Sequence, residues 1–228
     1  MGKVKIEDAI VSTIKQKSTL KHHVFDETYK VFNELKAVLS DFAIQYNLLL
    51  EGDDRRIKLE FFDKGEFVAL LKVAGDMLVF HMHSNAYEFD RDHKIWELQG
   101  IKDDSTGSYV GQIQIYNFLN DSFDYNRLND LGYLIARVFL NKNKHFFVEG
   151  KRQRNMGLGQ FGKHELTKAN IRIIVETAVL YALQFDLLVQ PYDNVKIISL
   201  QQVNEEIMNS TMRTGKRLGF QYNSDDVK

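Results

Sequence analysis

The chain has 228 residues, of which 44% are apolar and 27% charged, and its net charge is −1 at pH 7. A chain of this length and composition can bury a substantial core, and its balanced charge provides no overall field to indicate nucleic acid or a membrane surface as partner. Cysteine is absent, which excludes disulfides, thiolate metal sites and cysteine nucleophiles within this sequence.

Two helices are expected before residue 52. Residues 5–16 fit a short helix, and an apolar stripe with steps of three and four residues predicts a long helix over about 20–50. The stripe consists of Val24, Thr28, Val31, Leu35, Val38, Phe42 and Leu49. Gly52 supplies a C-terminal stop. Because the stripe is wider than a coiled-coil seam, we favour packing on a sheet over a dimeric coiled coil.

The hydrophobic period then changes to two, which predicts a sheet over about 55–118. Short apolar runs are separated by turn-like pairs such as Lys64-Gly65 and Gly75-Asp76, so the expected order is an antiparallel meander of four or five strands. One face of this sheet is expected to be apolar and the other mixed or polar.

Helices are predicted again after the sheet. Asp124 is a candidate cap for a helix whose apolar residues are Leu128, Leu131, Leu134, Ile135, Val138 and Phe139. Residues 145–149 fit a strand or an extended segment. A helix over about 165–189 follows and ends before Pro191, and a last strand at 195–198 precedes a final helix to about 213.

The order of helices, strands and helices predicts a fold of the α+β class. We expect a single domain over 1–228, with an antiparallel four- to five-stranded meander and helices from both termini packed on one face. The charged first residues do not resemble a signal peptide, and the longest apolar tract, 171–189, is interrupted by three charged side chains. We therefore expect a cytoplasmic protein with no membrane segment and no cofactor.

A basic, glycine-rich segment is the most informative local feature. From 142 to 172 there are eight Lys or Arg residues and only two acids. Glycine backbones can turn N–H groups toward an anion, and nearby cations would neutralise its charge. The expected anion-binding residues are Lys151, Arg152, Arg154, Gly157, Gly159, Gly162 and Lys163. A surface loop without a ligand and an oligomer contact are the competing interpretations.

Two phosphate-binding motifs match this segment but lack the required context. Gly157, Gly159 and Gly162 satisfy G-x-G-x-x-G, yet the preceding strand-like residues end about eight positions upstream. Gly157 to Lys163 satisfies G-x-x-x-x-G-K, but His164 stands where a P-loop needs Ser or Thr to hold magnesium. The segment therefore does not indicate a nucleotide hydrolase.

The polar face of the predicted sheet carries the other candidate site. His81 and His83 project from one face, opposite Phe80 and Met82, and could bind a metal with a third ligand. If the strands are neighbours, Gln112, Gln114 and Tyr116 lie near them. Such a face could also bind a ligand, single-stranded nucleic acid or a second copy of the chain.

The leading functional hypothesis is a non-enzymatic binding or interaction module that contacts an anionic, for example phosphate-bearing, ligand. A homodimer formed through the helices or the polar sheet face is the partner hypothesis, and the basic segment keeps nucleic acid open as a ligand. The alternative is a metal-dependent enzyme acting on a phosphorylated or nucleic-acid substrate, with Glu149, His81 or His83 holding the metal.

Overall fold

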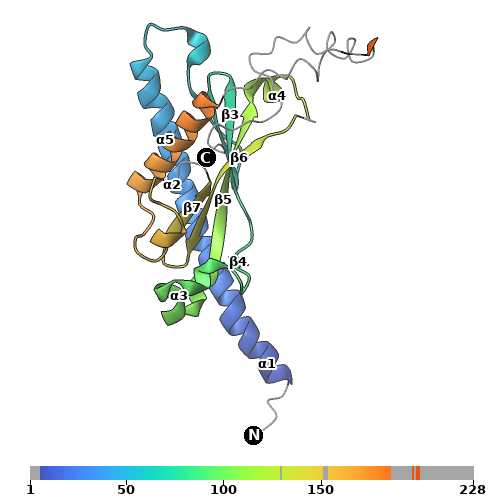
Figure 1. The fold of residues 1–228 in the computed structure, drawn as a ribbon, viewed down its shortest axis with the longest axis vertical. Helices are drawn as coiled ribbons and strands as arrows, with labels where there is room; N and C mark the ends of the chain where they lie inside the picture. Colours follow the sequence, from blue (N-terminus) through green and yellow to red (C-terminus); the bar gives the residue numbers. More distant parts are fainter. Residues whose placement is uncertain (1–5, 129, 151–153, 186–196, 198, 201–228) are drawn as a thin grey trace.

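The computed structural model describes residues 6–128, 130–150, 154–185, 197, 199 and 200. A continuous helical segment at the N-terminus comprises α1 (Ile6–Thr13), one π-helical stretch η1 (Ile14–Ser18) and α2 (Thr19–Leu49). It leads through the 3-10 turn η2 (Arg55–Ile57) into the sheet. The predicted short helix and long helix are both present, and α2 lies across one face of the sheet (Figure 1).

The sheet is a seven-stranded antiparallel meander. Along the main path the order is β1 (Glu60–Asp63), β2 (Val68–Val73), β3 (Asp76–Met82), β5 (Tyr109–Leu119), β6 (Tyr133–Asn141) and β7 (Phe146–Gly150). The short β4 (Tyr87–Glu88) pairs with the start of β5. The α+β class and the covering of one face by helices are therefore confirmed, and the sheet is larger than predicted.

The main core lies between the sheet and the helices α2 and α5 (Lys168–Gln184). Alternate strand residues such as Phe80, Met82 and Ile115 point into it and are almost completely buried, as the period of two requires. At the start of α5 a capping box joins Thr167 and Asn170, which satisfies backbone donors that a helix start leaves free.

On the opposite face of the sheet, the largest cover among the described residues lies at the end near β4. The segment between β4 and β5 forms η3 (Lys94–Glu97), α3 (Gln99–Asp103) and η4 (Ser105–Ser108). A second apolar cluster forms there from Ile95, Ile101, Val110, Phe139, Phe147 and Phe161. Beside this insertion, residues of β5, β6 and β7 on the same face line a pocket.

The prediction of a helix after Asp124 is wrong. Asp124 ends the short helix α4 (Asn120–Asp124), and β6 follows in place of a helix. Leu128 and Leu131 are 85% and 74% exposed, whereas Val138 is buried between β5 and β7. Toward its end β6 is covered on both faces, since Val138 and Leu140 belong to the main core and Phe139 to the second cluster, so its apolar run also satisfies a helical pattern.

Of the remaining predictions for the C-terminal part, some are confirmed and others concern residues that the structure does not describe. The strand expected at 145–149 is β7, and the helix expected over 165–189 is α5. The predicted strand at 195–198 and the final helix to about 213 lie almost entirely outside the described residues. Among the helices that are described, none combines the length and the apolar character needed to cross a bilayer.

Candidate functional site

A row of polar side chains crosses four neighbouring strands on the face away from α2. The backbone register pairs His81 with Gln114, Gln114 with Arg137, and Arg137 with Glu149. Because directly paired residues of an antiparallel sheet share a face, these four side chains lie side by side. The expectation that Gln114 lies near the histidines is confirmed, since His81 Nδ1 is 3.4 Å from Gln114 Oε1.

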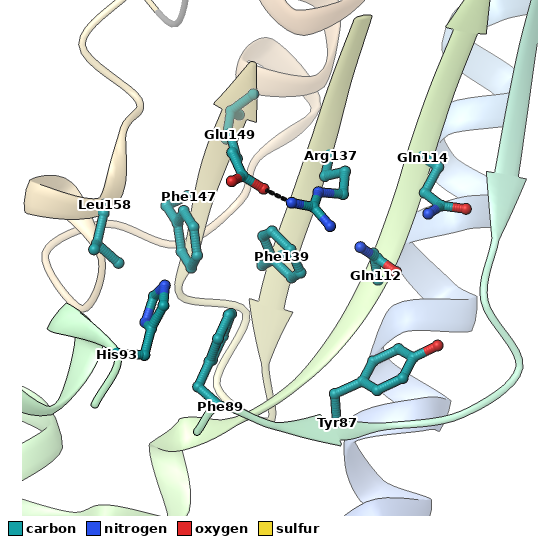
Figure 2. A pocket seen from close by; sticks show the side chains of 11 residues that line it. Tyr87, Phe89, His93, Gln112, Gln114, Arg137, Phe139, Phe147, Glu149 and Leu158 are labelled. Atoms are coloured by element: carbon teal, nitrogen blue, oxygen red, sulfur yellow. Dashed lines mark ion pairs between the residues drawn. The ribbon is translucent and has the colours of Figure 1, made fainter. Parts of the chain in front are cut away.

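This row borders a pocket of about 560 Å³. Figure 2 shows the Arg137 guanidinium above the Phe139 ring, with Glu149 on one side and the two glutamines on the other. The lining residues are Tyr87, Phe89, His93, Gln112, Gln114, Arg137, Phe139, Phe147, Val148, Glu149 and Leu158. Its size and mixture of apolar walls with a few polar groups are typical of a small-molecule site.

One half of the pocket is aromatic. The Phe89 ring stacks on His93 at 4.3 Å between centroids and meets Phe139 edge-on at 5.3 Å. Phe139 stacks on Phe147 at 4.9 Å, and Phe161 packs edge-on behind Phe147. Packing from behind holds these rings in place, so their outer surfaces form a preformed apolar wall.

The other half presents hydrogen-bonding groups. Gln112 is only 7% exposed, and its amide makes no hydrogen bond to any residue that the structure describes. Figure 2 shows this amide directed into the pocket. The amide is not among the fully buried side-chain atoms that lack a partner, so it can bond to water or to a molecule in the pocket.

Arg137 is the charged centre of the site. One of its terminal nitrogens pairs with a Glu149 carboxylate oxygen, and its guanidinium carbon lies 5.5 Å from the Phe139 ring centre. Its Nε atom is buried without a hydrogen-bond partner among the described residues. Glu149 balances the charge of Arg137, so the pocket carries no net charge from this pair.

Tyr87 stands at the rim beside His83, with ring centroids 4.8 Å apart. Partial burial raises the pKa of the Tyr87 hydroxyl above its ordinary value. The hydroxyl therefore stays protonated at neutral pH and can donate a hydrogen bond to a ligand.

The basic loop reaches the pocket through one described residue, Leu158. Met156 and Phe161 anchor the loop in the two apolar clusters, whereas Arg154 and Lys163 are exposed. Gly162 has a positive φ of 86°, and Gly157 begins the 3-10 turn η5 (Leu158–Gln160) that contains Gly159. Lys151 and Arg152 lie outside the described residues, so anion binding by this loop stays a prediction.

The paired histidines lie at the opposite border of the same face. Their ring centroids are 6.4 Å apart, and His83 Nδ1 accepts a hydrogen bond from the Asn85 backbone N–H. Within the described part of the chain, no group of three or more metal-ligating side chains is present, and Glu149 is paired with Arg137. Metal binding by His81 and His83 therefore stays a prediction without a described third ligand.

Comparisons with other proteins provide no family for this chain. No protein-family model matches it, and searches of curated proteins and of solved structures found no match either. Function must therefore be inferred from the pocket itself.

Sequence reasoning identified part of this site and missed its centre. The period-two pattern predicts that Gln112, Gln114 and the histidines share a sheet face, whereas the apolar spacing predicts a helix that contains Arg137 and Phe139. The signal for a strand was present in the β-branched and aromatic residues from Tyr133 to Phe139, but the apolar spacing fitted both structures.

Proposed function

We propose that the chain is a non-catalytic binding protein whose pocket takes a small molecule with a flat ring and a hydrogen-bonding edge. The observation that carries the proposal is the Gln112 side chain: the residue is 7% exposed, and its amide, which makes no hydrogen bond to a described residue, is directed into the pocket. An amide offers one carbonyl acceptor and two N–H donors, so it would pair with a ring that presents both types of group.

The aromatic wall supports a flat ligand. Phe89, Phe139 and Phe147 gather on one side of the pocket, where their faces and edges can stack on a ring. Stacking on aromatic side chains contributes about 1–3 kcal/mol per base in nucleic-acid complexes, and Gln amides pair with the edge of a purine. The ligand class that combines both features is a nucleobase or a similar heteroaromatic ring.

The charge of the ligand depends on the adjoining loop. Since Glu149 already pairs with Arg137, the pocket itself favours an uncharged ring. A phosphate attached to that ring would leave the pocket past Leu158 toward the basic loop, whose Arg154 and Lys163 are exposed. This arrangement would join the expected anion-binding segment to the pocket.

Isothermal titration calorimetry with purine and pyrimidine nucleosides and their 5′-monophosphates tests the proposal. We expect at least one nucleoside to bind. Gln112→Leu keeps the side-chain size but removes the amide, so it should weaken that binding about tenfold, the worth of one buried hydrogen bond. Gln45→Leu is the matched control, because Gln45 is exposed on the outer side of α2.

Two outcomes would contradict the proposal: absence of binding across the whole series, or equal binding by wild type and Gln112→Leu. The monophosphates test the loop separately. If they bind more tightly than the nucleosides, replacing Lys151, Arg152, Arg154 and Lys163 by Ala should remove the difference. If the replacements do not remove it, the loop does not bind the phosphate.

A further inference from the structure

The His93 ring is held in the wall of the pocket by contacts on two sides. His93 is the N-cap of η3, and its Nδ1 atom accepts a hydrogen bond from the Ile95 backbone N–H at 3.2 Å. The ring stacks on Phe89 at 4.3 Å between centroids. Ile95 is completely buried in the second apolar cluster, so its backbone N–H is a fixed point of attachment for the imidazole.

The hydrogen bond to Nδ1 determines which ring nitrogen carries the proton. A nitrogen that accepts a hydrogen bond has no hydrogen of its own, so the neutral imidazole carries its proton on Nε2. Nε2 makes no hydrogen bond to any residue that the structure describes. His93 lines the pocket, and Figure 2 shows its ring pointing toward Leu158 and Phe147. The pocket therefore contains a second hydrogen-bond donor, separate from the Gln112 amide.

The Gln112 amide and His93 lie on opposite sides of the aromatic wall. In Figure 2, the rings of Phe89 and Phe139 stand between them. The pocket volume of about 560 Å³ suits a ligand larger than a single ring. A ring that bonds to Gln112 and stacks on Phe139 therefore leaves room beside His93 for a second group of the same ligand.

We propose that this second group is a sugar, so that the ligand is a nucleoside unit, and that His93 Nε2–H donates a hydrogen bond to a sugar hydroxyl oxygen. The inference rests on the proposed function and narrows its ligand class. A hydroxyl oxygen accepts a hydrogen bond from a neutral imidazole. The carbon atoms of the sugar would contact Leu158 and Phe147 beside the donor, whereas a free base would end before it reaches His93.

Two substitutions of His93 separate the pocket donor from the helix cap. His93→Asn keeps an amide oxygen near the position of Nδ1, so it can still accept from the Ile95 N–H, but it has no group at the position of Nε2. His93→Gln carries an amide N–H near the position of Nε2 and loses the cap acceptor. Both variants lose the ring that stacks on Phe89, so each is the matched control for the other.

Isothermal titration calorimetry with a nucleoside and its free base measures the effect. Wild type should bind the nucleoside more tightly than the base. His93→Asn should weaken nucleoside binding about tenfold, as the loss of one hydrogen bond does, whereas His93→Gln should keep most of it. The free base should bind equally to the two variants. Equal weakening of nucleoside binding by both variants, or a wild type that binds base and nucleoside equally, would overturn the inference.

Nitrogen-15 magnetic resonance of the histidine rings tests the donor without a ligand. We expect the His93 signals of the Nε2–H tautomer at neutral pH. An Nδ1–H tautomer would overturn the inference whether or not a ligand binds. If the base binds through Gln112 and the sugar adds nothing, this inference fails while the proposed function stands. If no base and no nucleoside binds, both fail.

Discussion

Gly111 shows at the scale of one residue how closely α2 approaches the sheet. A Cβ atom at Gly111 would lie 2.0 Å from Thr28 Oγ1 and 2.8 Å from Thr28 Cβ. Thr28 is completely buried, and its hydroxyl donates a hydrogen bond to the Val24 carbonyl at 2.7 Å. The absent side chain of Gly111 therefore sets the distance between α2 and β5.

We expect Gly111→Ala to lower the free energy of unfolding by about 2–3 kcal/mol, because the added methyl group must displace Thr28 or the helix. Chemical denaturation measures this change. Gly159→Ala is the control, since a Cβ at Gly159 meets nothing within 4 Å, and it should change stability by less than ~0.5 kcal/mol. Equal stability of the two variants would show that α2 does not approach β5 this closely.

Glu27 contributes pH-dependent stability. It is 9% exposed, pairs with Lys30 at 2.6 Å and lies 3.9 Å from Lys144. The hydrogen bond from Lys30 holds the pKa of the carboxyl below its ordinary value of 4.5. A lowered folded-state pKa stabilises the fold fully above the unfolded-state pKa, and this contribution is lost as the pH falls through the folded-state pKa.

Glu27→Gln should therefore lower the free energy of unfolding by about 0.5–1 kcal/mol at pH 7. The difference from wild type should shrink below about pH 4.5. Urea denaturation between pH 3 and 7 measures it. Glu34→Gln, an exposed change on the same helix with no ion pair in the described part of the chain, is the control. A difference that is constant with pH would contradict the assigned role.

At the scale of the elements, β6 is where the structure departs from the sequence prediction. A helix over 125–139 would bury Leu131, whereas the structure exposes Leu131 and buries Val138. We expect Leu131→Ala to change the free energy of unfolding by less than ~0.5 kcal/mol and Val138→Ala to lower it by about 2 kcal/mol. Thermal denaturation with calorimetry separates the two, and a larger loss at Leu131 would favour the helix.

The other elements were predictable where one periodicity dominated. α2 has a stripe of buried residues along one side, and β3 alternates the buried Phe80 and Met82 with the half-buried Val79 and His81. In both cases one side meets the core and the other meets solvent, so the pattern is unambiguous. The end of β6 packs on both sides, with Val138 in the main core and Phe139 in the second cluster, so its apolar run carries no alternation that separates a strand from a helix.

The pocket could be predicted only in part, because it depends on long-range pairing. The residues of the polar row come from four strands between His81 and Glu149, and no local spacing connects them. Gln112 and Gln114 are predictable because they lie on a strand with a clear period of two. The aromatic wall is not, because its rings meet only when the insertion between β4 and β5 folds back over the sheet.

At the scale of the whole molecule, the sheet separates two surfaces with different roles. α2 and α5 cover one face with the main core. The opposite face carries a polar row, a partial cover and the pocket between them. Stability is thus concentrated on the helical side, so polar substitutions on the pocket side should alter binding more than folding.

The most direct test of this division is a nuclear magnetic resonance titration that observes glutamine side-chain amides and arginine Nε–H groups. We titrate with the nucleoside or nucleotide that binds best in calorimetry. We expect the largest shifts at the Gln112 amide and Arg137 Nε–H, with Gln45 on α2 unchanged. Shifts confined to groups on the helical side, with Gln112 and Arg137 unchanged, would contradict the assignment of the open sheet face as the binding site.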